Sequence, residues 1–269
     1  MQKLQDGRYL GGNIFESRIN GLIISQSSYQ QNYCSSWHYH ENSYFAFILK
    51  GGSIERRKGN EIECTPGLLL YYNTQEPHKN EKYLAGSKNF NIEFQHSWFE
   101  NMHIKKNILE GGMIIKEPVI KSLFLNIMAE AMEPGSETHL SIEASVLKCF
   151  SVLKNKNKNY VSAPAWLIRL KELLAETENH HYSLAELSVL FGVHPVTISK
   201  LFPHFFHCTI GEYIRKTRIE KSLSLLSKKY IPLASISSAC GFADHGHFTR
   251  VFKKHTGFTP SRYREILLR

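Results

Sequence analysis

Cysteine is scarce in this sequence, and its placement excludes the most familiar cysteine-based scaffolds. The 269 residues include five cysteines, an odd number with no C-x-x-C pair, so we expect neither a disulfide framework nor a structural zinc site. No apolar run approaches the roughly 18 residues of a membrane span, and the opening MQKLQDGRYL has no signal-peptide core. These absences predict a cytoplasmic protein without a membrane partner.

Acidic residues are few relative to basic ones, and the imbalance lies at one end of the chain. Lys and Arg number 33 against 24 Asp and Glu, a net charge of +9. Residues 165–269 hold 15 of the basic and 8 of the acidic residues. A basic module of this kind is typical of nucleic-acid binding. With 42% hydrophobic residues, the chain is long and apolar enough for two folded domains.

The pattern changes from β to helical after the first third of the chain. Residues 21–96 contain short runs of aromatic and branched residues separated by Gly, Asn or Pro, which predicts a sandwich or barrel. Residues 117–132 and 141–156 place apolar side chains on one helical face. We expect one of these helices to form a dimer contact, with packing against the barrel as the alternative.

A polar, charged stretch predicts the boundary between two domains. Residues 154–164 read KNKNKNYVSAP, a composition typical of a linker. The sequence therefore predicts a first domain over 1–158, a linker over 159–164 and a second domain over 165–269.

The second domain contains an internal repeat with a period of about 50 residues. Residues 198–202 match residues 248–252, and each block follows a short helical pattern and a Gly turn. Helix, turn and helix twice over predicts two helix-turn-helix units. The spacer at 211–229 predicts a helix of roughly 28 Å at 1.5 Å per residue, and Ser183 with Glu186 forms a capping box before the first unit.

The second unit resembles the signature of the AraC/XylS family of bacterial transcription regulators. The matching features within residues 236–265 are Gly241-Phe242, Asp244, Phe248, Arg250, Phe252-Lys253-Lys254, Gly257, Thr259-Pro260 and Tyr263-Arg264. The resemblance extends over about 166–269. It implies an α+β two-domain protein: an N-terminal cupin-like β-barrel with helices, then an all-α domain with two helix-turn-helix motifs joined by a long helix.

The same resemblance implies the function and the partners. We expect a sequence-specific DNA-binding transcription regulator controlled by a small-molecule effector in the N-terminal barrel. The implied partners are double-stranded promoter or operator DNA, a second copy of the chain in a homodimer and, for an activator, RNA polymerase.

DNA-contacting positions follow from the register of the two units. They are Val196, Thr197, Ser199 and Lys200 in the first unit and His245, Gly246, His247, Thr249, Arg250, Lys253 and Lys254 in the second. Lys253 and Lys254 are expected to reach phosphates, whereas the earlier positions of the second unit enter the groove. The first unit departs from the family: His194 stands where Ser commonly caps, and His207 replaces the Gly that matches Gly257.

Three histidines in the first domain suggest a site of a second kind. His38 and His40, followed by Pro66-Gly67 and His78, resemble a cupin barrel, in whose enzymes three His and one Glu bind Fe, Mn or Zn. Tyr44 or Phe45 occupies the expected Glu position, and Glu41 alternates to the wrong face. A metal site, a pocket for an organic ligand and plain barrel packing are the three interpretations. Our prediction is a ligand pocket with no metal or cofactor, formed by His38, His40, Tyr44, Tyr72 and His78.

Three functions therefore compete. A regulator is favoured over an enzyme by the family resemblance and by the missing carboxylate. The main alternative is a metal-dependent cupin enzyme fused to a DNA-binding module, and the third is a co-regulator that binds another protein through its barrel and contacts DNA only weakly. Among the remaining features, Cys208 and Cys240 are interpreted as packed thiols, and Arg56-Arg57-Lys58 as a charged hairpin tip.

Overall fold

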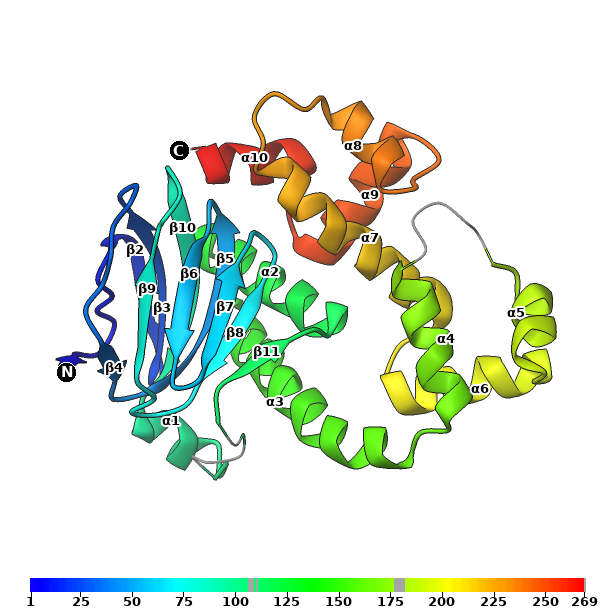
Figure 1. Cartoon of the computed structure of the whole chain (residues 1–269), viewed down its shortest axis with the longest axis horizontal. Helices are drawn as coiled ribbons and strands as arrows, with labels where there is room; N and C mark the ends of the chain where they lie inside the picture. Colours follow the sequence, from blue (N-terminus) through cyan, green and yellow to red (C-terminus); the bar gives the residue numbers. More distant parts are fainter. Residues whose placement is uncertain (106–108, 110, 177–181, 269) are drawn as a thin grey trace.

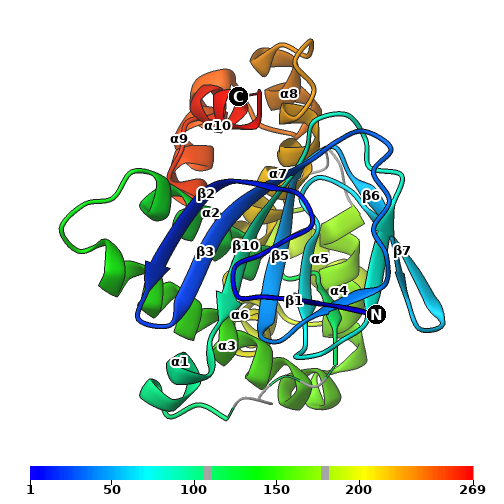
Figure 2. The ribbon, with the colours of Figure 1, turned by 90° about the vertical axis from the view of Figure 1, so that its left-hand side faces the viewer.

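Two β-sheets facing each other form the N-terminal half of this computed structural model (Figures 1 and 2). The structure describes residues 1–105, 109, 111–176 and 182–268, with the backbone alone over 155–162. The strands are β1 (Gln2–Leu4), β2 (Gly12–Ile19), β3 (Leu22–Tyr29), β4 (His38–His40), β5 (Ser43–Lys50), β6 (Ser53–Arg57), β7 (Asn60–Cys64), β8 (Leu69–Tyr72), β9 (His78–Glu81), β10 (Ser87–Phe94) and β11 (Met113–Ile115). One sheet has the order β1-β4-β9-β6-β7 and the other β11-β8-β5-β10-β3-β2. The β-rich segment predicted at 21–96 is confirmed and extends further at both ends.

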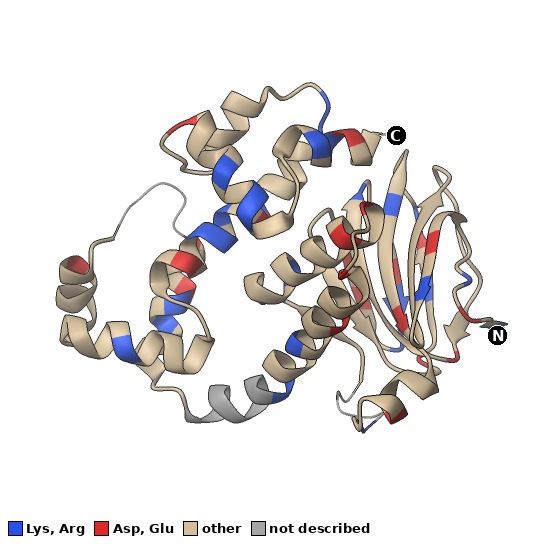
Figure 3. Ribbon diagram, turned by 180° about the vertical axis from the view of Figure 1, so that it is seen from behind, with Lys and Arg blue, Asp and Glu red and all other residues tan. Residues whose placement is uncertain are grey.

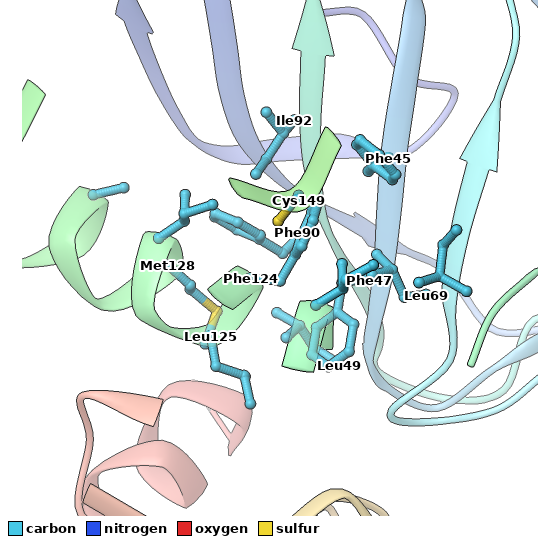
Figure 4. Packing of buried hydrophobic residues seen from close by; sticks show 14 of the residues in the cluster. Phe45, Phe47, Leu49, Leu69, Phe90, Ile92, Phe124, Leu125, Met128 and Cys149 are labelled. Carbon is cyan, nitrogen blue, oxygen red and sulfur yellow. The ribbon is translucent and has the colours of Figure 1, made fainter. Parts of the chain in front are cut away.

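Strand β5 shows how one sequence serves two cores. Its side chains alternate between the faces of the sheet: Tyr44, Ala46 and Ile48 belong to a cluster between the two sheets. Phe45 and Phe47 belong to the larger core on the opposite face, where they lie near helical residues such as Phe124, Met128 and Cys149 (Figure 4). Because both faces of β5 are covered, seven of its eight residues are buried.

Helices cover the outer face of the six-stranded sheet. They are α1 (His96–Asn101), α2 (Pro118–Met132) and α3 (Thr138–Ser162), so both predicted helices are present. The predicted linker at 159–164 is helical as far as Ser162, and only Ala163 and Pro164 separate α3 from α4. The polar stretch that begins at Lys154 contains three Lys residues before position 159, and Lys is a good helix former, which is why polar composition alone misplaced the end of the helix.

Helix α2 lies between the barrel and the C-terminal helices. None of its residues is exposed, because one side packs on the sheet and on α3 and another contacts α7 and α9. An ion pair joins Lys121 of α2 to Glu220 of α7, and Glu133 Oε1 lies 3.0 Å from Arg262 Nη2. The sequence predicted a dimer contact on α2 or on α3. Because α2 is already covered by other helices of the same chain, α3 is the candidate that remains.

The C-terminal helices repeat at the predicted period. They are α4 (Ala165–Glu176), α5 (Leu184–Phe191), α6 (Pro195–Phe206), α7 (Ile210–Leu226), α8 (Leu233–Ala239), α9 (His245–Thr256) and α10 (Pro260–Leu268). Helix α9 begins and ends 50 residues after α6, and α10 begins 50 residues after α7. Helix α7 runs from one unit to the other (Figure 1), as the predicted spacer helix does.

Length and apolar content give little reason to place a helix in a membrane. Among the described residues, no single helix has both the length and the apolar content to cross a membrane. The pair α5 and α6 reaches that length and apolar content only when the two helices are taken together, and they are bent by 92° at the break between them.

Candidate nucleic-acid interface and barrel pocket

The second helix of each helix-turn-helix unit begins at a side-chain cap. The Nδ1 atom of His194 accepts a hydrogen bond from the N–H of Val196 at 3.3 Å, and Oδ1 of Asp244 accepts one from the N–H of His247 at 2.6 Å. That bond, together with the charge of Arg250, holds the pKa of the Asp244 carboxyl below its ordinary value. Thus the His194 side chain serves as the N-cap of α6.

The two helices also end alike, although their residues differ. His207 follows α6 with φ of 56°, and Gly257 follows α9 with φ of 78°. Both are left-handed, a conformation that Gly adopts readily and most other residues avoid. His207, which stands at the position equivalent to Gly257, therefore adopts the same left-handed backbone conformation as that glycine.

Helix α6 presents its predicted DNA-contacting residues to solvent. Val196, Thr197, Ser199 and Lys200 are all exposed. The hydroxyl of Ser199 donates to the carbonyl of Val196 at 3.0 Å. Their neighbours Ile198 and Phe202 are buried in the core of the first unit, so the helix has one packed face and one open face.

Helix α9 has the same division between its faces, with stronger charge. His245, Arg250, Lys253 and Lys254 are exposed, and Gly246, His247 and Thr249 are half-buried. The Thr249 hydroxyl is buried without a hydrogen-bond partner among the described atoms. It therefore does not lie on the exposed face of α9 that carries Arg250. Lys and Arg recur along the C-terminal helices (Figure 3).

The barrel brings the three predicted histidines together on two paired strands. His38 and His40 are two residues apart on β4 and so point to the same face. His78 on β9 is paired directly opposite His38. One ring nitrogen from each lies within 4.8 Å of the others, and all three side chains are buried.

Burial keeps these imidazoles neutral. It lowers the pKa of His38 and of His40, the latter well below its ordinary value, and brings the pKa of His78 to about 4. The charges of neighbouring histidines lower the pKa of His40 and of His78 further. Near neutral pH each ring therefore carries one proton and one nitrogen lone pair that can accept a hydrogen bond or bind a ligand.

The predicted tyrosines lie on the wall opposite the histidines. The Tyr44 hydroxyl lies 3.1 Å from Nε2 of His78, and the rings of Tyr44 and Tyr72 stack with centroids 4.3 Å apart. Burial raises the pKa of both phenols well above the ordinary value. All five residues predicted to bind a ligand thus line one cavity between the sheets.

A buried carboxylate in this cavity escaped the sequence analysis. Glu55 of β6 accepts hydrogen bonds from the Tyr72 hydroxyl, from Nδ2 of Asn80 at 3.2 Å and from Nε of Arg57 at 2.6 Å. Arg57 also donates to Glu76 at 3.0 Å. Arg57 does lie at the tip of the β6–β7 hairpin, where it pairs with Asn60, as predicted. Only 9% of its side chain is exposed, however, so it is not simply a charged turn residue. The sequence offers one signal for the burial of Glu55: in a strand, side chains alternate between faces, so with Arg56 pointing outward the neighbouring Glu55 points into the barrel.

The residues present fit part of the metal site found in cupin enzymes. Glu41 is exposed on the rim, with Oε2 2.7 Å from Nζ of Lys3, so it supplies no ligand to the histidines, as predicted. Glu55 is committed to three other partners. The three imidazoles do converge, so the set that fits is three nitrogens without a carboxylate.

Four of the five cysteines are buried, and Cys34 is exposed. Cys208 and Cys240 are both buried, as predicted, and burial raises the pKa of the Cys208 thiol to about 11. Such a thiol is protonated at neutral pH and unreactive.

Comparisons with known proteins agree with the C-terminal geometry. Residues 187–266 match the family described as a helix-turn-helix domain. PqrA of Proteus vulgaris is 38% identical over 68 residues, which are 25% of this chain and 56% of PqrA. The arabinose operon regulatory protein of Salmonella typhimurium is 23% identical over 237 residues, 80% of this chain and 81% of that protein.

These similarities cover different shares of the compared proteins. The match to PqrA spans little more than half of its length. Among solved structures, ToxT from Vibrio cholerae O395 has a TM-score of 0.38 at 15% identity, covering 92% of this chain and 98% of ToxT.

Proposed function

We propose that this protein is a sequence-specific DNA-binding transcription regulator of the AraC family without enzymatic activity, because residues 187–266 match a helix-turn-helix domain family and residues 236–265 resemble the AraC/XylS signature. The observation that carries the proposal is the repeat itself. Two recognition helices, α6 and α9, follow the same turn, occupy equivalent positions 50 residues apart and present exposed polar or basic residues. Recognition helices on one rigid spacer suit successive major grooves, about 34 Å apart.

The barrel supplies the regulatory input in this proposal. A ligand bound at His38, His40, Tyr44, Tyr72 and His78 lies on the inner face of the sheet whose outer face packs on α2 and α3. Helix α2 in turn contacts α7 and α9. A ligand that favours one arrangement of the barrel therefore shifts the equilibrium between arrangements of the two DNA-binding units.

The proposal includes the wider setting of a regulator. The partners are promoter or operator DNA in the cytoplasm, a second copy of the chain and, in activation, RNA polymerase. We assign the dimer contact to the outer face of α3, where Leu140 is 65% exposed, while Ile142 and Val146 on the inner face pack in the core.

The test is a footprint of the purified full-length chain on the DNA flanking its own gene, at several salt concentrations. We expect protection over two successive major grooves for each protomer. Affinity should fall steeply with salt, because each neutralised phosphate releases counterions. Protection that disappears in Arg250→Ala supports α9 as a reading helix; equal protection in wild type and variant contradicts it.

A further inference from the structure

The histidine cluster has features that plain packing does not require. His38, His40 and His78 are respectively 4%, 3% and 2% exposed, and the rings of His38 and His78 have centroids only 4.3 Å apart. Nδ1 of His40 is buried with no hydrogen-bond partner among the described atoms. An unsatisfied buried polar atom destabilises the fold, and a ligand bound at this nitrogen would satisfy it.

The other two rings are oriented by the backbone. Nδ1 of His38 lies 2.9 Å from the carbonyl oxygen of Ser36, and Nδ1 of His78 lies 3.0 Å from that of Glu76. A carbonyl only accepts, so the proton resides on Nδ1 and the lone pair on Nε2. This is the arrangement of metal-binding histidines, whose second nitrogen donates to a carbonyl or carboxylate.

We propose that His38, His40 and His78 bind one divalent first-row transition-metal ion, of the Zn²⁺ class, through one nitrogen each. Three imidazoles suit Zn, Cu, Fe or Ni better than Mg or Ca, which prefer oxygen ligands. This inference rests on the proposed function, since it names the class of ligand that the regulatory barrel takes.

The size of the cavity favours an ion over an organic ligand. The cavity bounded by the histidines, Tyr44 and Tyr72 has a volume of about 20 Å³. One water-sized group needs about 10–15 Å³ on this scale, so an organic effector requires side-chain movement and an ion does not.

The geometry needs only small adjustments. A tetrahedral ion with bonds of about 2.0–2.1 Å has ligand nitrogens about 3.4 Å apart. The nitrogens here lie within 4.8 Å of one another, so ring rotations close the set once the Tyr44 hydroxyl, 3.1 Å from Nε2 of His78, moves off that nitrogen. Glu55 is near enough for its charge to act on His38 and His78, and this negative charge favours a bound cation.

The experiment is a Zn²⁺ titration of the full-length chain after removal of metals by chelation, in competition with a chromophoric chelator. We expect one equivalent to bind. His40→Gln and His78→Gln should each weaken binding by more than about 100-fold, because each removes a direct ligand. The matched control is His96→Gln, whose exposed ring on α1 pairs with Glu100; it should bind as wild type does.

A second measurement needs no variant. Co²⁺ added to the metal-free wild-type chain should give visible absorption typical of four- or five-coordinate nitrogen ligation, saturating at one equivalent and displaced by Zn²⁺. Binding that survives both substitutions in folded protein, or a wild-type chain with no one-equivalent site, overturns the proposal. DNA binding is measured separately: a chain that binds DNA but no metal refutes only the metal site, and the reverse refutes only the regulator.

Discussion

Arg250 and Lys253 lie one turn apart on the exposed face of α9, yet we expect them to make different contacts with DNA. Arg250→Ala should weaken specific binding by about 1–3 kcal/mol and relax the preference at one base, as for a base-reading Arg. Lys253→Ala should weaken binding to all sequences and lower the salt slope by about 1, as for a phosphate contact. Affinities for variant sites at several salt concentrations separate the two. Exchanged phenotypes would refute the assignment.

The buried carboxylate of the barrel yields a prediction on stability. Glu55→Gln leaves Arg57 with only Glu76 as a charged partner, and disrupting a buried ion pair on one side is destabilising by about 3 kcal/mol. The matched control is Glu63→Gln on the adjacent strand β7, whose side chain is exposed. Urea unfolding should show a clearly lower midpoint for the first variant alone. Equal midpoints would mean that Glu55 contributes nothing to the fold.

His255 at the end of α9 gives the pH dependence of stability a specific source. Burial lowers its pKa to about 4, and the charges of Lys216, Arg215 and Lys254 act in the same direction against Glu212. An unfolded His titrates near pH 6.5, so the unfolded chain binds the extra proton between about pH 6.5 and 4. The stability that neutral His255 provides is therefore complete above pH 6.5 and is lost as the pH falls toward 4.

Replacing this group should flatten the profile. His255→Gln should reduce the slope of unfolding free energy against pH in that window by up to about 1.4 kcal/mol per pH unit, the value for one proton. His245→Gln, at an exposed position of the same helix, should leave the slope unchanged. Unfolding at pH 4.5, 5.5 and 7 measures both. An unaltered slope in His255→Gln would contradict the burial argument.

For single residues, the sequence predicted those positions that depend only on spacing along the chain. The two-residue spacing of His38 and His40 places them on one face, and repeat register located Arg250. Glu55 could not be found, because its approach to Tyr72 and Asn80 depends on how β6, β8 and β9 are brought together in space. Burial of the Thr249 hydroxyl likewise depends on tertiary packing, which sequence spacing does not reveal.

Among the elements, α5 depends on the capping box that the sequence predicted. The Ser183 hydroxyl accepts from the N–H of Glu186 at 3.2 Å, and Glu186 accepts from the N–H of Ser183 at 2.7 Å. Ser183→Ala should destabilise the first unit by about 1 kcal/mol. Ser188→Ala within the same helix is the control and should have almost no effect. Hydrogen exchange of α5 and α6 amides measures this; equal protection in both variants would contradict the role of the cap.

Element prediction succeeded where periodicity is strong and failed where pairing decides. Helices α2 and α7 lie almost where their apolar period places them. Strands β1 and β11 have three residues each, too few to show alternation, and they exist because a neighbouring strand offers hydrogen bonds. The end of α3 was placed too early because a polar composition is compatible with a helix as well as with a linker.

For the whole molecule, the contact between α2 and α9 links barrel and DNA-binding units. A Cβ on Gly257 would lie 2.6 Å from Cβ of Ala129 in α2. Gly257→Ala should therefore be destabilising by about 3 kcal/mol, from left-handed strain plus the clash. Gly192→Ala has the left-handed strain but no neighbour within 4 Å and should be destabilising by about 1 kcal/mol. Urea unfolding midpoints of the two variants compare these effects. An equal loss of stability in both would contradict a close contact between the end of α9 and α2.

This arrangement was beyond the sequence for a physical reason. An apolar helix face indicates that something covers it, not which element does so. Helix α2 was open to a dimer contact on sequence grounds, and the structure covers it with α7 and α9 of the same chain. Two-domain organisation, by contrast, was predicted from the polar stretch at 154–164 and from the family resemblance, and the structure confirms it.

The most direct test of the central claim is selection of binding sites by the purified full-length chain from a pool of random DNA duplexes. The account predicts an enriched motif of two blocks whose centres lie about one helical turn, 10–10.5 base pairs, apart. Arg250→Ala should lose the preference in one block, and Lys200→Ala should alter only the other. A pool that shows no enriched motif, or a single block unaffected by Arg250→Ala, would contradict the claim that α6 and α9 read DNA together.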